Sequence, residues 1–524
     1  MSSDVAGGSS RRSPEREAEV AGRRTSPEVA AAGRRTLPER EAEVVGRRTS
    51  PEVAVAEWKH KEKRTSLRRE VDVAMTSDTK DEGSRSKKMR ATGEGAVATA
   101  IRKENGLMRS DKKKGTLEVV HKHGPCSTFS KDKVKSLSVE EILTLDQNKV
   151  KSIRSRLTIN TQASKATFPA KPERTGLGNY VVRVGLGTPK KDLSLLFDTG
   201  SHITWTQCQP CLYLCYSQQE PFFQPSSSTT YSNVSCTAPE CSALNNATQL
   251  RHGCDSSSTC KYNMIYFADV TASFGLFGKD KLTLTSKDDV INDFYFGCGH
   301  SNQGQFGVAA GVLGLGPDKL SFVSQSANKY GKVFSYCLPS RASNTGYLTF
   351  GKDGVASDNV AYTPFSNSKG STLYELKLEA IFVGGKKLAI SPTVFSSAGM
   401  AIASRIVFTK LPPTAYAALR QAFRAEMTNY TLAKPLDKLD TCYDFSNTTT
   451  FTVPGISMLF GGNTKVDISS HGILVEKKKQ SCLAFVANEK KSDFGIFGSF
   501  QQKTLKVVYD IPAGKVGFAY RGCA

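Results

Sequence analysis

The chain has 524 residues, a formal net charge of +22, and 39% hydrophobic residues, of which the aromatic ones make up 9% of the chain. This length leaves room for two or three domains, and the apolar content is sufficient for a large core. No run of about 20 apolar residues is present and the first 30 residues contain no apolar stretch, so we expect neither a transmembrane helix nor a signal peptide.

The N-terminal residues 1–110 are rich in Arg, Glu, Ser, Ala and Gly, and the sequence of Pro14–Val20 is repeated without change at Pro38–Val44. Solenoid repeats bury an apolar face in every unit, whereas these units hold only isolated Val and Ala. We therefore predict a disordered, basic, low-complexity tail. Its positive charge could attract nucleic acid, but the basic residues alternate with Glu and lack aromatic stacking partners, so DNA binding is the weaker alternative.

Residues 111–170 form a different segment. A short strand and turn are predicted from Leu117 to Cys126, and apolar residues at helical spacing predict a helix from Ser138 to Arg156. Ser138 fits the N-cap of this helix and Glu141 fits the reciprocal capping position. A polar linker over roughly residues 158–178 follows.

From Gly178 onward, short alternating apolar runs are separated by Gly, Asn, Asp and Ser turns, which is typical of β-strands. The clearest helix is predicted from Pro413 to Phe423, with proline at its start. The sequence thus predicts an all-β fold in two lobes, which we place at residues 178–355 and 356–524.

The 13 cysteines indicate an oxidising compartment. Cys126 precedes the β-rich region, and the other twelve suit six disulfides. Cys208-x-x-Cys211 could suggest zinc, but no second pair at zinc-finger spacing follows, so we expect no metal and no cofactor. Four sequons are compatible with glycosylation in such a compartment, at Asn233, Asn246, Asn429 and Asn447.

The chemically most informative motif is Asp198-Thr199-Gly200-Ser201, which follows the apolar run Leu195–Phe197. Two carboxylates that share one proton can hydrolyse a peptide bond, because one activates a water while the other protonates the carbonyl oxygen. Each needs a tight loop, in which Thr braces the backbone and Gly permits close approach. The apolar-Gly elements of Ala310–Gly316 and Ile496–Gly498 make a chance match improbable.

With these motifs, the chain from about Thr116 to its end resembles the nepenthesin-type plant aspartic proteases. The resemblance also rests on shorter motifs at Gly178–Tyr180, Gly185–Pro189, Phe296–Gly299, Phe334–Leu338, Thr409–Pro413 and Val508–Asp510. It implies a bilobal pepsin-like fold, acid endopeptidase activity on peptides or proteins in an interlobe cleft, a monomer, and a secreted or vacuolar setting. It also implies that Leu117–Leu157 is similar to the pro-peptide that covers the cleft until low pH releases it. Its implied disulfides are Cys442 with Cys482, and Cys298 with Cys523.

The second active-site loop of this family reads Asp-Ser-Gly-Thr shortly before Leu-Pro-Pro, and here that register gives Ala403, Ser404 and Arg405. No Asp or Glu lies between Glu379 and Glu426. An Arg405 side chain in the cleft would hold Asp198 ionised. We therefore predict a peptide-binding pseudoprotease whose catalysis is lost or strongly impaired, with a working acid endopeptidase as the alternative.

The resemblance places a substrate-covering flap near Tyr266-Phe267-Ala268-Asp269. Aligning the family's flap motif from Cys260 makes Tyr266 the flap tyrosine, whereas aligning it backwards from Gly275 places Phe267 at that position. Asp269 is the last residue of the motif. His202 follows Ser201, and we expect it to be a hydrogen-bonded loop residue rather than a catalytic base.

Overall fold

The structure, a computed structural model, describes residues 114–129, 137–158, 180–266, 271–284, 289–354, 359–366, 372–396, 399–447, 450–477 and 479–523. The chain divides into two compact units, Met1–Arg102 and Lys103–Ala524, and every described residue belongs to the second. The predicted disordered tail therefore lies outside the described residues. In the part of the chain that is described, no helix has the length and apolar content needed to cross a bilayer.

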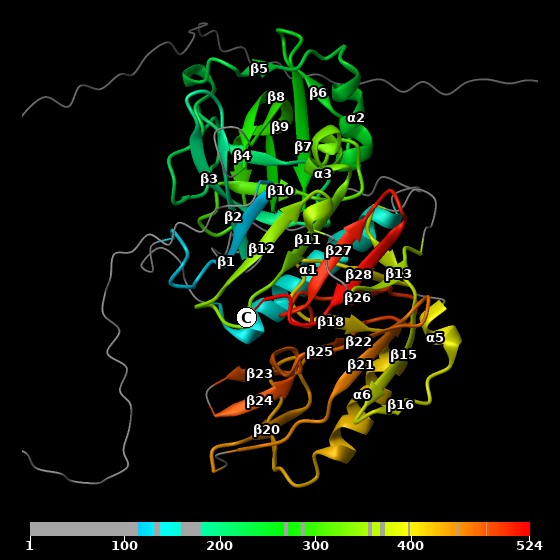
Figure 1. Cartoon of the computed structure of the whole chain (residues 1–524). Helices are drawn as coiled ribbons and strands as arrows, with labels where there is room; N and C mark the ends of the chain where they lie inside the picture. The colour runs from blue at the N-terminus through cyan, green and yellow to red at the C-terminus, as the bar shows by residue number, and fades with distance from the viewer. Residues whose placement is uncertain are drawn as a thin grey trace, which may run out of the picture. The chain divides into compact units, whose positions relative to one another are not determined.

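The second unit is mostly β, as predicted, and its largest sheet has 15 strands (Figure 1). In spatial order this sheet contains β13 (Ala361–Pro364), β28 (Lys515–Ala519), β27 (Lys506–Asp510), β11 (Val333–Cys337), β12 (Thr345–Phe350), β1 (Thr116–His121), β2 (Tyr180–Leu186), β3 (Lys191–Asp198), β10 (Gly311–Gly314), β4 (Trp205–Gln207), β9 (Val290–Gln303), β8 (Ala272–Thr283), β7 (Cys260–Ile265) and β6 (Gly253–Cys254), with β5 (Ser232–Asn233) paired to β8.

Three smaller sheets follow in the second half of the chain. The first contains β14 (Glu375–Leu376), β17 (Met400–Ile402), β26 (Gly495–Phe497), β18 (Thr409–Leu411) and β25 (Phe485–Ala487). The second contains β16 (Lys386–Lys387), β15 (Leu378–Val383), β21 (Ile456–Phe460) and β22 (Thr464–Asp467), and the third contains β19 (Leu432–Ala433), β20 (Cys442–Asp444), β24 (Gln480–Leu483) and β23 (Leu474–Lys477).

The helices are few and mostly short. They are α1 (Val139–Thr158), α2 (Pro239–Thr248), α3 (Phe322–Gln325), α4 (Ala327–Tyr330), α5 (Pro392–Ser396) and α6 (Pro413–Glu426), with 3₁₀ turns at Pro225–Ser227, Lys352–Gly354 and Ser470–Gly472. The predicted helix at Pro413 is α6, which buries an apolar face of Ala415, Tyr416, Leu419 and Phe423.

The capping box predicted for α1 is present. The backbone N–H of Glu141 donates to Ser138 Oγ at 3.2 Å, and the N–H of Ser138 donates to Glu141 Oε2 at 2.7 Å. These bonds satisfy two of the donors that a helix start leaves free. The helix therefore begins where the sequence predicted, after Ser138.

The two lobes repeat one arrangement of strands. In the first lobe, β10 lies parallel to β3 and antiparallel to β4, and β4 lies parallel to β9. In the second lobe, β26 lies parallel to β17 and antiparallel to β18, and β18 lies parallel to β25. Each central strand has a glycine at or directly after its end whose N–H donates to a threonine hydroxyl, Gly314 to Thr204 at 3.1 Å and Gly498 to Thr409 at 3.0 Å. The loops after β3 and β17 are therefore structurally equivalent.

Six disulfides join the twelve cysteines from Cys208 to Cys523, and Cys126 is free and exposed. Cys442 and Cys482 lie directly opposite each other on β20 and β24 and form one bridge. The other bridges join Cys208–Cys298, Cys211–Cys215, Cys236–Cys254, Cys241–Cys260 and Cys337–Cys523.

The predicted bridge between Cys298 and Cys523 is wrong. Cys298 lies on β9 beside the end of β4, where its Cα is 5.4 Å from that of Cys208. Cys523 follows β28 and lies 5.9 Å, Cα to Cα, from Cys337 at the end of β11. A disulfide requires Cα atoms within about 7 Å, so strand neighbours in the long sheet determine both partners.

Candidate active site

The loops after β3 and β17 meet between the lobes and bind each other reciprocally. The N–H of Thr199 donates to Ser404 Oγ at 3.1 Å, and the N–H of Ser404 donates to Thr199 Oγ1 at 3.1 Å. This pairing makes Thr199 the counterpart of Ser404, so Asp198 corresponds to Ala403 and Gly200 to Arg405. The structure thus places one carboxylate, one methyl group and one guanidinium where two equivalent loops face each other.

The Asp198 carboxylate is buried and fully engaged. Its Oδ1 accepts from the N–H of Gly200 at 2.8 Å, and its Oδ2 accepts from Ser201 Oγ at 2.6 Å and from Nη1 of Arg405 at 2.9 Å. All three donors bind the charged form of the carboxyl more strongly than the neutral form. The ion pair with Arg405 is itself buried, with the Arg405 side chain 6% exposed and that of Asp198 10% exposed.

The pKa of Asp198 is lowered from its usual value of 3.8. Burial alone would raise this pKa, but the positive charge of Arg405, with the bonds from Ser201 and Gly200, outweighs burial. A carboxyl that is already ionised at acid pH cannot hold the proton that a catalytic pair must share. The expected effect of Arg405 on this carboxyl is therefore present in the structure.

Arg405 uses only part of its guanidinium in these contacts. Its Cζ lies 5.3 Å from the centroid of the Tyr266 ring, a cation–π contact, and the Tyr266 hydroxyl accepts from Nε1 of Trp205 at 2.7 Å. The Nε and Nη2 atoms of Arg405 are buried and have no hydrogen-bond partner among the described residues. Of the two candidate flap residues, Tyr266 therefore faces the site, whereas Phe267 and Asp269 lie outside the described residues.

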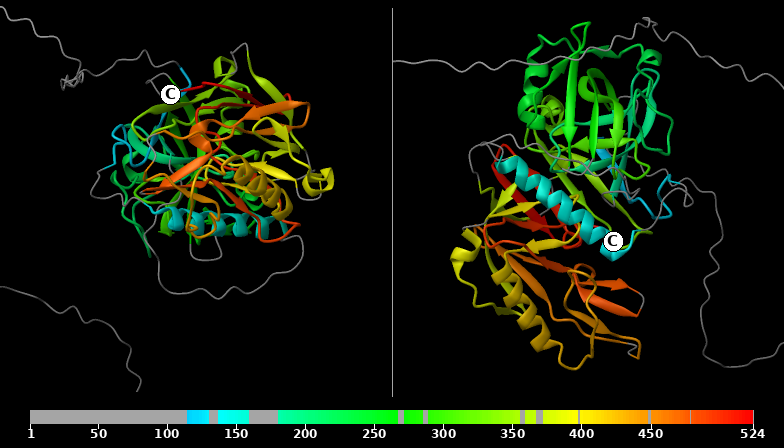
Figure 2. Two further views of the ribbon diagram at one scale, coloured as in Figure 1. Left: turned by 90° about the horizontal axis from the view of Figure 1, so that it is seen from below. Right: turned by 180° about the vertical axis from the view of Figure 1, so that it is seen from behind.

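Helix α1 lies across this site. Figure 2 shows it, in cyan, between the green strands of the first lobe and the yellow-to-red strands of the second. Asp146 Oδ2 accepts from the backbone N–H groups of Val407 and Phe408 at 2.8 and 2.9 Å, and Lys149 Nζ donates to the Arg405 carbonyl at 2.7 Å. The helix is thus bound to the backbone of the second active-site loop itself.

Apolar side chains of α1 also pack over the site around Asp198. Val150 packs against Ala403, Ile406 and Ile496, and Leu145 belongs to the apolar core of the first lobe. A cavity of about 30 Å³ remains beside Asp198, room for a single water-sized group. A peptide can therefore reach Asp198 only if α1 moves away.

His202 is buried and makes no hydrogen bond to Asp198 or Arg405 that the described residues show. Its Nδ1 lies 3.1 Å from the carbonyl oxygen of Ala247 and its Nε2 lies 2.7 Å from that of Thr372. These contacts tie the first active-site loop to both lobes, in agreement with a hydrogen-bonded loop histidine. The four sequon asparagines, Asn233, Asn246, Asn429 and Asn447, are exposed and could accept a glycan.

Sequence reasoning missed Asp146 and Lys149. Both are almost fully buried, and they form a 3.3 Å ion pair one helical turn apart. The sequence held one indication of their burial, because Asp146 and Lys149 lie on the same face of the predicted helix as the apolar Val150. Their partners are backbone atoms 256 to 262 residues away along the chain, which no local pattern predicts.

His121 is the last residue of β1 and His123 follows two residues later, and we expect both to make the attachment of this N-terminal segment sensitive to acid. Burial, followed by the charges of neighbouring cations, lowers the pKa of His121 from 6.5 to about 3, and burial and Lys122 lower that of His123 to about 4. Lys503 is among the cations that face His121.

We expect the segment to detach from β2 and β12 as the pH falls from 6.5 toward 3. The detached form binds protons at the higher pKa, so the attachment has its full strength above pH 6.5 and weakens below it. Hydrogen exchange of the β1 amides, followed from pH 7 to pH 3, measures this. Replacing both histidines by Gln should keep the amides protected to lower pH, whereas protection that is equal in parent and variant at every pH would contradict the prediction.

Comparison with known proteins identifies relatives over most of the described region. Sequence models described as xylanase inhibitor N-terminal and xylanase inhibitor C-terminal match residues 180–352 and 373–520. An aspartyl protease family protein of Arabidopsis thaliana is 51% identical over 425 residues, which is 79% of this chain and 89% of the relative.

Two further matches extend this comparison. The aspartic proteinase nepenthesin-2 of Nepenthes gracilis is 32% identical over 380 residues, or 71% of this chain and 84% of the relative. The crystal structure of edgp superposes with a TM-score of 0.54 at 21% identity and covers 67% of this chain and 93% of that one. This last likeness concerns the fold.

Proposed function

Because this chain belongs to the family of plant pepsin-like aspartic proteases, we propose that it is a member that binds peptides or proteins in its interlobe cleft without cleaving them. The single observation that carries the proposal is the buried ion pair between Asp198 and Arg405, at 2.9 Å. One carboxylate that is locked in its charged form can bind water, but it cannot perform both proton transfers of the reaction.

The position of Ala403 supports the same conclusion. It stands at the point equivalent to Asp198, and its methyl group packs against Val150 of α1 and against Ile406. No other carboxylate lines the cavity beside Asp198 among the described residues. Among the described residues, Asp198 is therefore the one acid available at this cavity.

The alternative, a working acid endopeptidase, draws support from the names of the relatives, which are proteases. The family description also names inhibitors of xylanase. Binding of a protein partner without cleavage agrees with the inhibitor name, and both kinds of name imply that proteins of this fold bind other proteins. Binding, rather than hydrolysis, is thus the function that agrees with this pair of loops.

The disulfides support a secreted or vacuolar setting for this function. The six bridges require oxidation, and the longest of them joins residues 186 positions apart, Cys337 and Cys523. Closing so long a loop restricts the unfolded chain strongly. We propose that the protein folds in an oxidising compartment, where the four exposed sequons could be modified.

Helix α1 adds a condition to this function. It covers the cavity beside Asp198, where we propose that a peptide binds, so binding requires that the segment is displaced by acid or removed. The acid detachment predicted for β1 supplies the first route, because β1 and α1 belong to one segment of the chain. Peptide binding should accordingly be stronger near pH 4 than at pH 7.

The test is an assay of the full chain with denatured globin at pH 3 to 5, with and without pepstatin. We expect turnover roughly 10⁴-fold or more below that of a family member with both aspartates, because catalytic groups that act as a unit fail together. Nepenthesin-2, prepared in parallel, is the matched positive control. Cleavage by this chain that pepstatin inhibits would contradict the proposal.

A further inference from the structure

A second cavity, of about 580 Å³, lies on the outer face of the first lobe, away from Asp198. Strands β7, β8 and β9 form its floor and the loop closed by the Cys211–Cys215 disulfide forms its wall. This volume is in the range of pockets that hold small molecules. Most of its lining is carbon, from Pro210, Leu212, Tyr213, Tyr262, Phe274 and Leu276.

The Cys211–Cys215 loop presents three apolar side chains to solvent. Leu212, Tyr213 and Leu214 are 60%, 87% and 47% exposed. The two cysteines are only four positions apart in the sequence, so the disulfide closes a tight loop. The three side chains within this loop point to solvent. Half of the large hydrophobic residues that are exposed in the described part of the chain belong to this loop. Clusters of exposed apolar side chains are frequent at binding sites.

Among the polar residues that line this cavity, His300 is placed there by a β-bulge. The register of β8 and β9 pairs Phe274 with Ser301 and then Gly275 with Gly299, so His300 is the extra residue of a β-bulge. A bulge turns one side chain away from the regular alternation, and bulges are frequent beside functional sites. A Cβ on Gly275 would lie 2.0 Å from the carbonyl oxygen of Cys298, so the bulge requires glycine there.

The chemistry presented by His300 is defined by its contacts. Its Nδ1 lies 2.9 Å from the carbonyl oxygen of Pro210, which can only accept, so Nδ1 carries the proton. Burial lowers the pKa of His300, which keeps the ring neutral near pH 7. Its Nε2 therefore presents a lone pair, and this atom has no hydrogen-bond partner among the described residues, although the residue is only 7% exposed.

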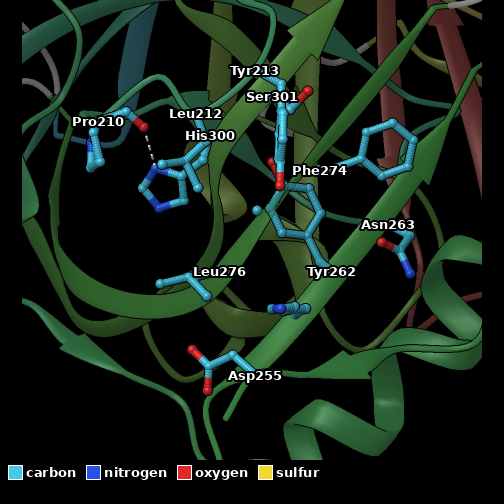
Figure 3. Close-up of a pocket in the computed structure, with 12 residues that line it drawn as sticks. Pro210, Leu212, Tyr213, Asp255, Tyr262, Asn263, Phe274, Leu276, His300 and Ser301 are labelled. Atoms are coloured by element: carbon cyan, nitrogen blue, oxygen red, sulfur yellow. Dashed lines mark hydrogen bonds between the residues drawn. The ribbon is translucent and has the colours of Figure 1, made fainter. Parts of the chain in front are cut away.

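Figure 3 shows the arrangement of these groups. The imidazole of His300 lies beside Leu212 and Pro210 on one side of the cavity, and the ring of Phe274 lies on the other side. Backbone bonds fix the wall to the floor, because the N–H of Leu212 donates to the His300 carbonyl at 2.8 Å. The cavity is therefore built in advance of any ligand.

We propose that this cavity, the Cys211–Cys215 loop pocket, binds an uncharged aromatic compound that carries a hydroxyl group. The ring lies among the carbon walls, and the hydroxyl donates to Nε2 of His300. The lining also includes Lys261, Asn263 and Ser301, but its surface is mostly apolar, which favours an aromatic ring over a sugar that needs a polar partner for each hydroxyl. Asp255 at the rim is occupied by its own turn, since its Oδ1 accepts three bonds from Ser257 and Thr259.

The test compares 4-ethylphenol with ethylbenzene, which has the same body without the hydroxyl, by ligand-observed NMR titration of the full chain at pH 7. We expect the phenol to bind about fivefold more tightly, the effect of one neutral hydrogen bond. His300→Phe should abolish this difference. Tyr213→Ala should weaken both compounds by about threefold, whereas Leu432→Ala, at another exposed large hydrophobic residue that lies outside the pocket, should change neither.

Further ligands test whether the natural phenol group belongs to a protein or to a free small molecule, and whether the pocket prefers a carboxylate or a sugar. A peptide with one central tyrosine that binds tenfold more tightly than 4-ethylphenol would identify a tyrosine side chain of a partner protein as the natural source, and weaker binding would indicate a free phenolic compound. Tighter binding of 4-ethylbenzoate through Lys261, binding of glucose instead, or equal binding of 4-ethylphenol and ethylbenzene would overturn the proposal. None of these outcomes depends on the interlobe cleft, so the pocket and the proposed function are tested separately.

Discussion

Replacing Ala403 by Asp and Arg405 by Gly in the same chain is expected to create acid endopeptidase activity, with a gain of about 10⁴ in turnover of denatured globin at pH 3 to 5. The two loops already hold each other through the reciprocal bonds of Thr199 and Ser404, so a carboxylate at residue 403 would face Asp198. Two carboxylates that face each other in a buried site cannot both ionise, so the pair would retain one proton.

The second substitution is as necessary as the first. While Arg405 remains, it lowers the pKa of Asp198 and occupies the space where a glycine would permit backbone contact. Ala403→Asp alone should therefore yield little activity, and Arg405→Gly alone should yield none, because one carboxylate is still missing. Activity should appear only in the double variant and should be sensitive to pepstatin.

The matched control is Ala403→Asn with Arg405→Gly, which has the same shape but no second acid. It should remain inactive while its melting temperature agrees with that of the active double variant. Equal activity in the parent and the Asp variant would refute the assignment of Ala403 as the vacant catalytic position. A folded Asp variant that stays inactive, even after its N-terminal segment is released at low pH, would refute it as well.

The second large effect concerns stability. Asp198→Asn is expected to lower the free energy of unfolding at pH 7 by about 3–5 kcal/mol, because it leaves the buried guanidinium of Arg405 without a counter-charge. Arg405→Met should also destabilise the protein, since the carboxylate of Asp198 then keeps only the bonds from Ser201 and Gly200. The double variant, Asp198→Asn with Arg405→Met, should lose much less than the sum of the two.

The pH dependence of this loss has a definite sign. The pKa of Asp198 is lowered in the folded protein, so its contribution to stability is complete above the usual value of 3.8 and disappears as the pH falls through the lower, folded value. The difference between the parent and Asp198→Asn should therefore shrink in strong acid. Denaturant unfolding at pH 7 and at about pH 2 measures both quantities.

An exposed ion pair supplies the control for this experiment. Lys386 and Glu426 lie 3.1 Å apart, with side chains 81% and 38% exposed. Lys386→Ala should change stability by less than about 1 kcal/mol, because water and salt screen such pairs. If Asp198→Asn were equally mild, the buried pair would not have the role that we assign to it.

Much of the fold could be predicted from local sequence. The alternating apolar runs, the capping box at Ser138 and the proline at the start of α6 correspond to strands and helix ends in the structure. These features depend on residues within a few positions of each other. The cysteine pairs could not be predicted in this way, because the order of strands in the long sheet determines the partners of Cys298 and Cys523.

The sequence by itself determined the family, the all-β fold, and the identities of Asp198, Ala403 and Arg405 as the residues of two paired loops. Only the tertiary structure decided that Arg405 turns toward Asp198 and that Asp146 and Lys149 of α1 bind the second loop. The physical reason is distance along the chain. Motifs depend on neighbours in sequence, whereas the charge state of a buried carboxylate depends on groups that folding brings from more than 200 residues away.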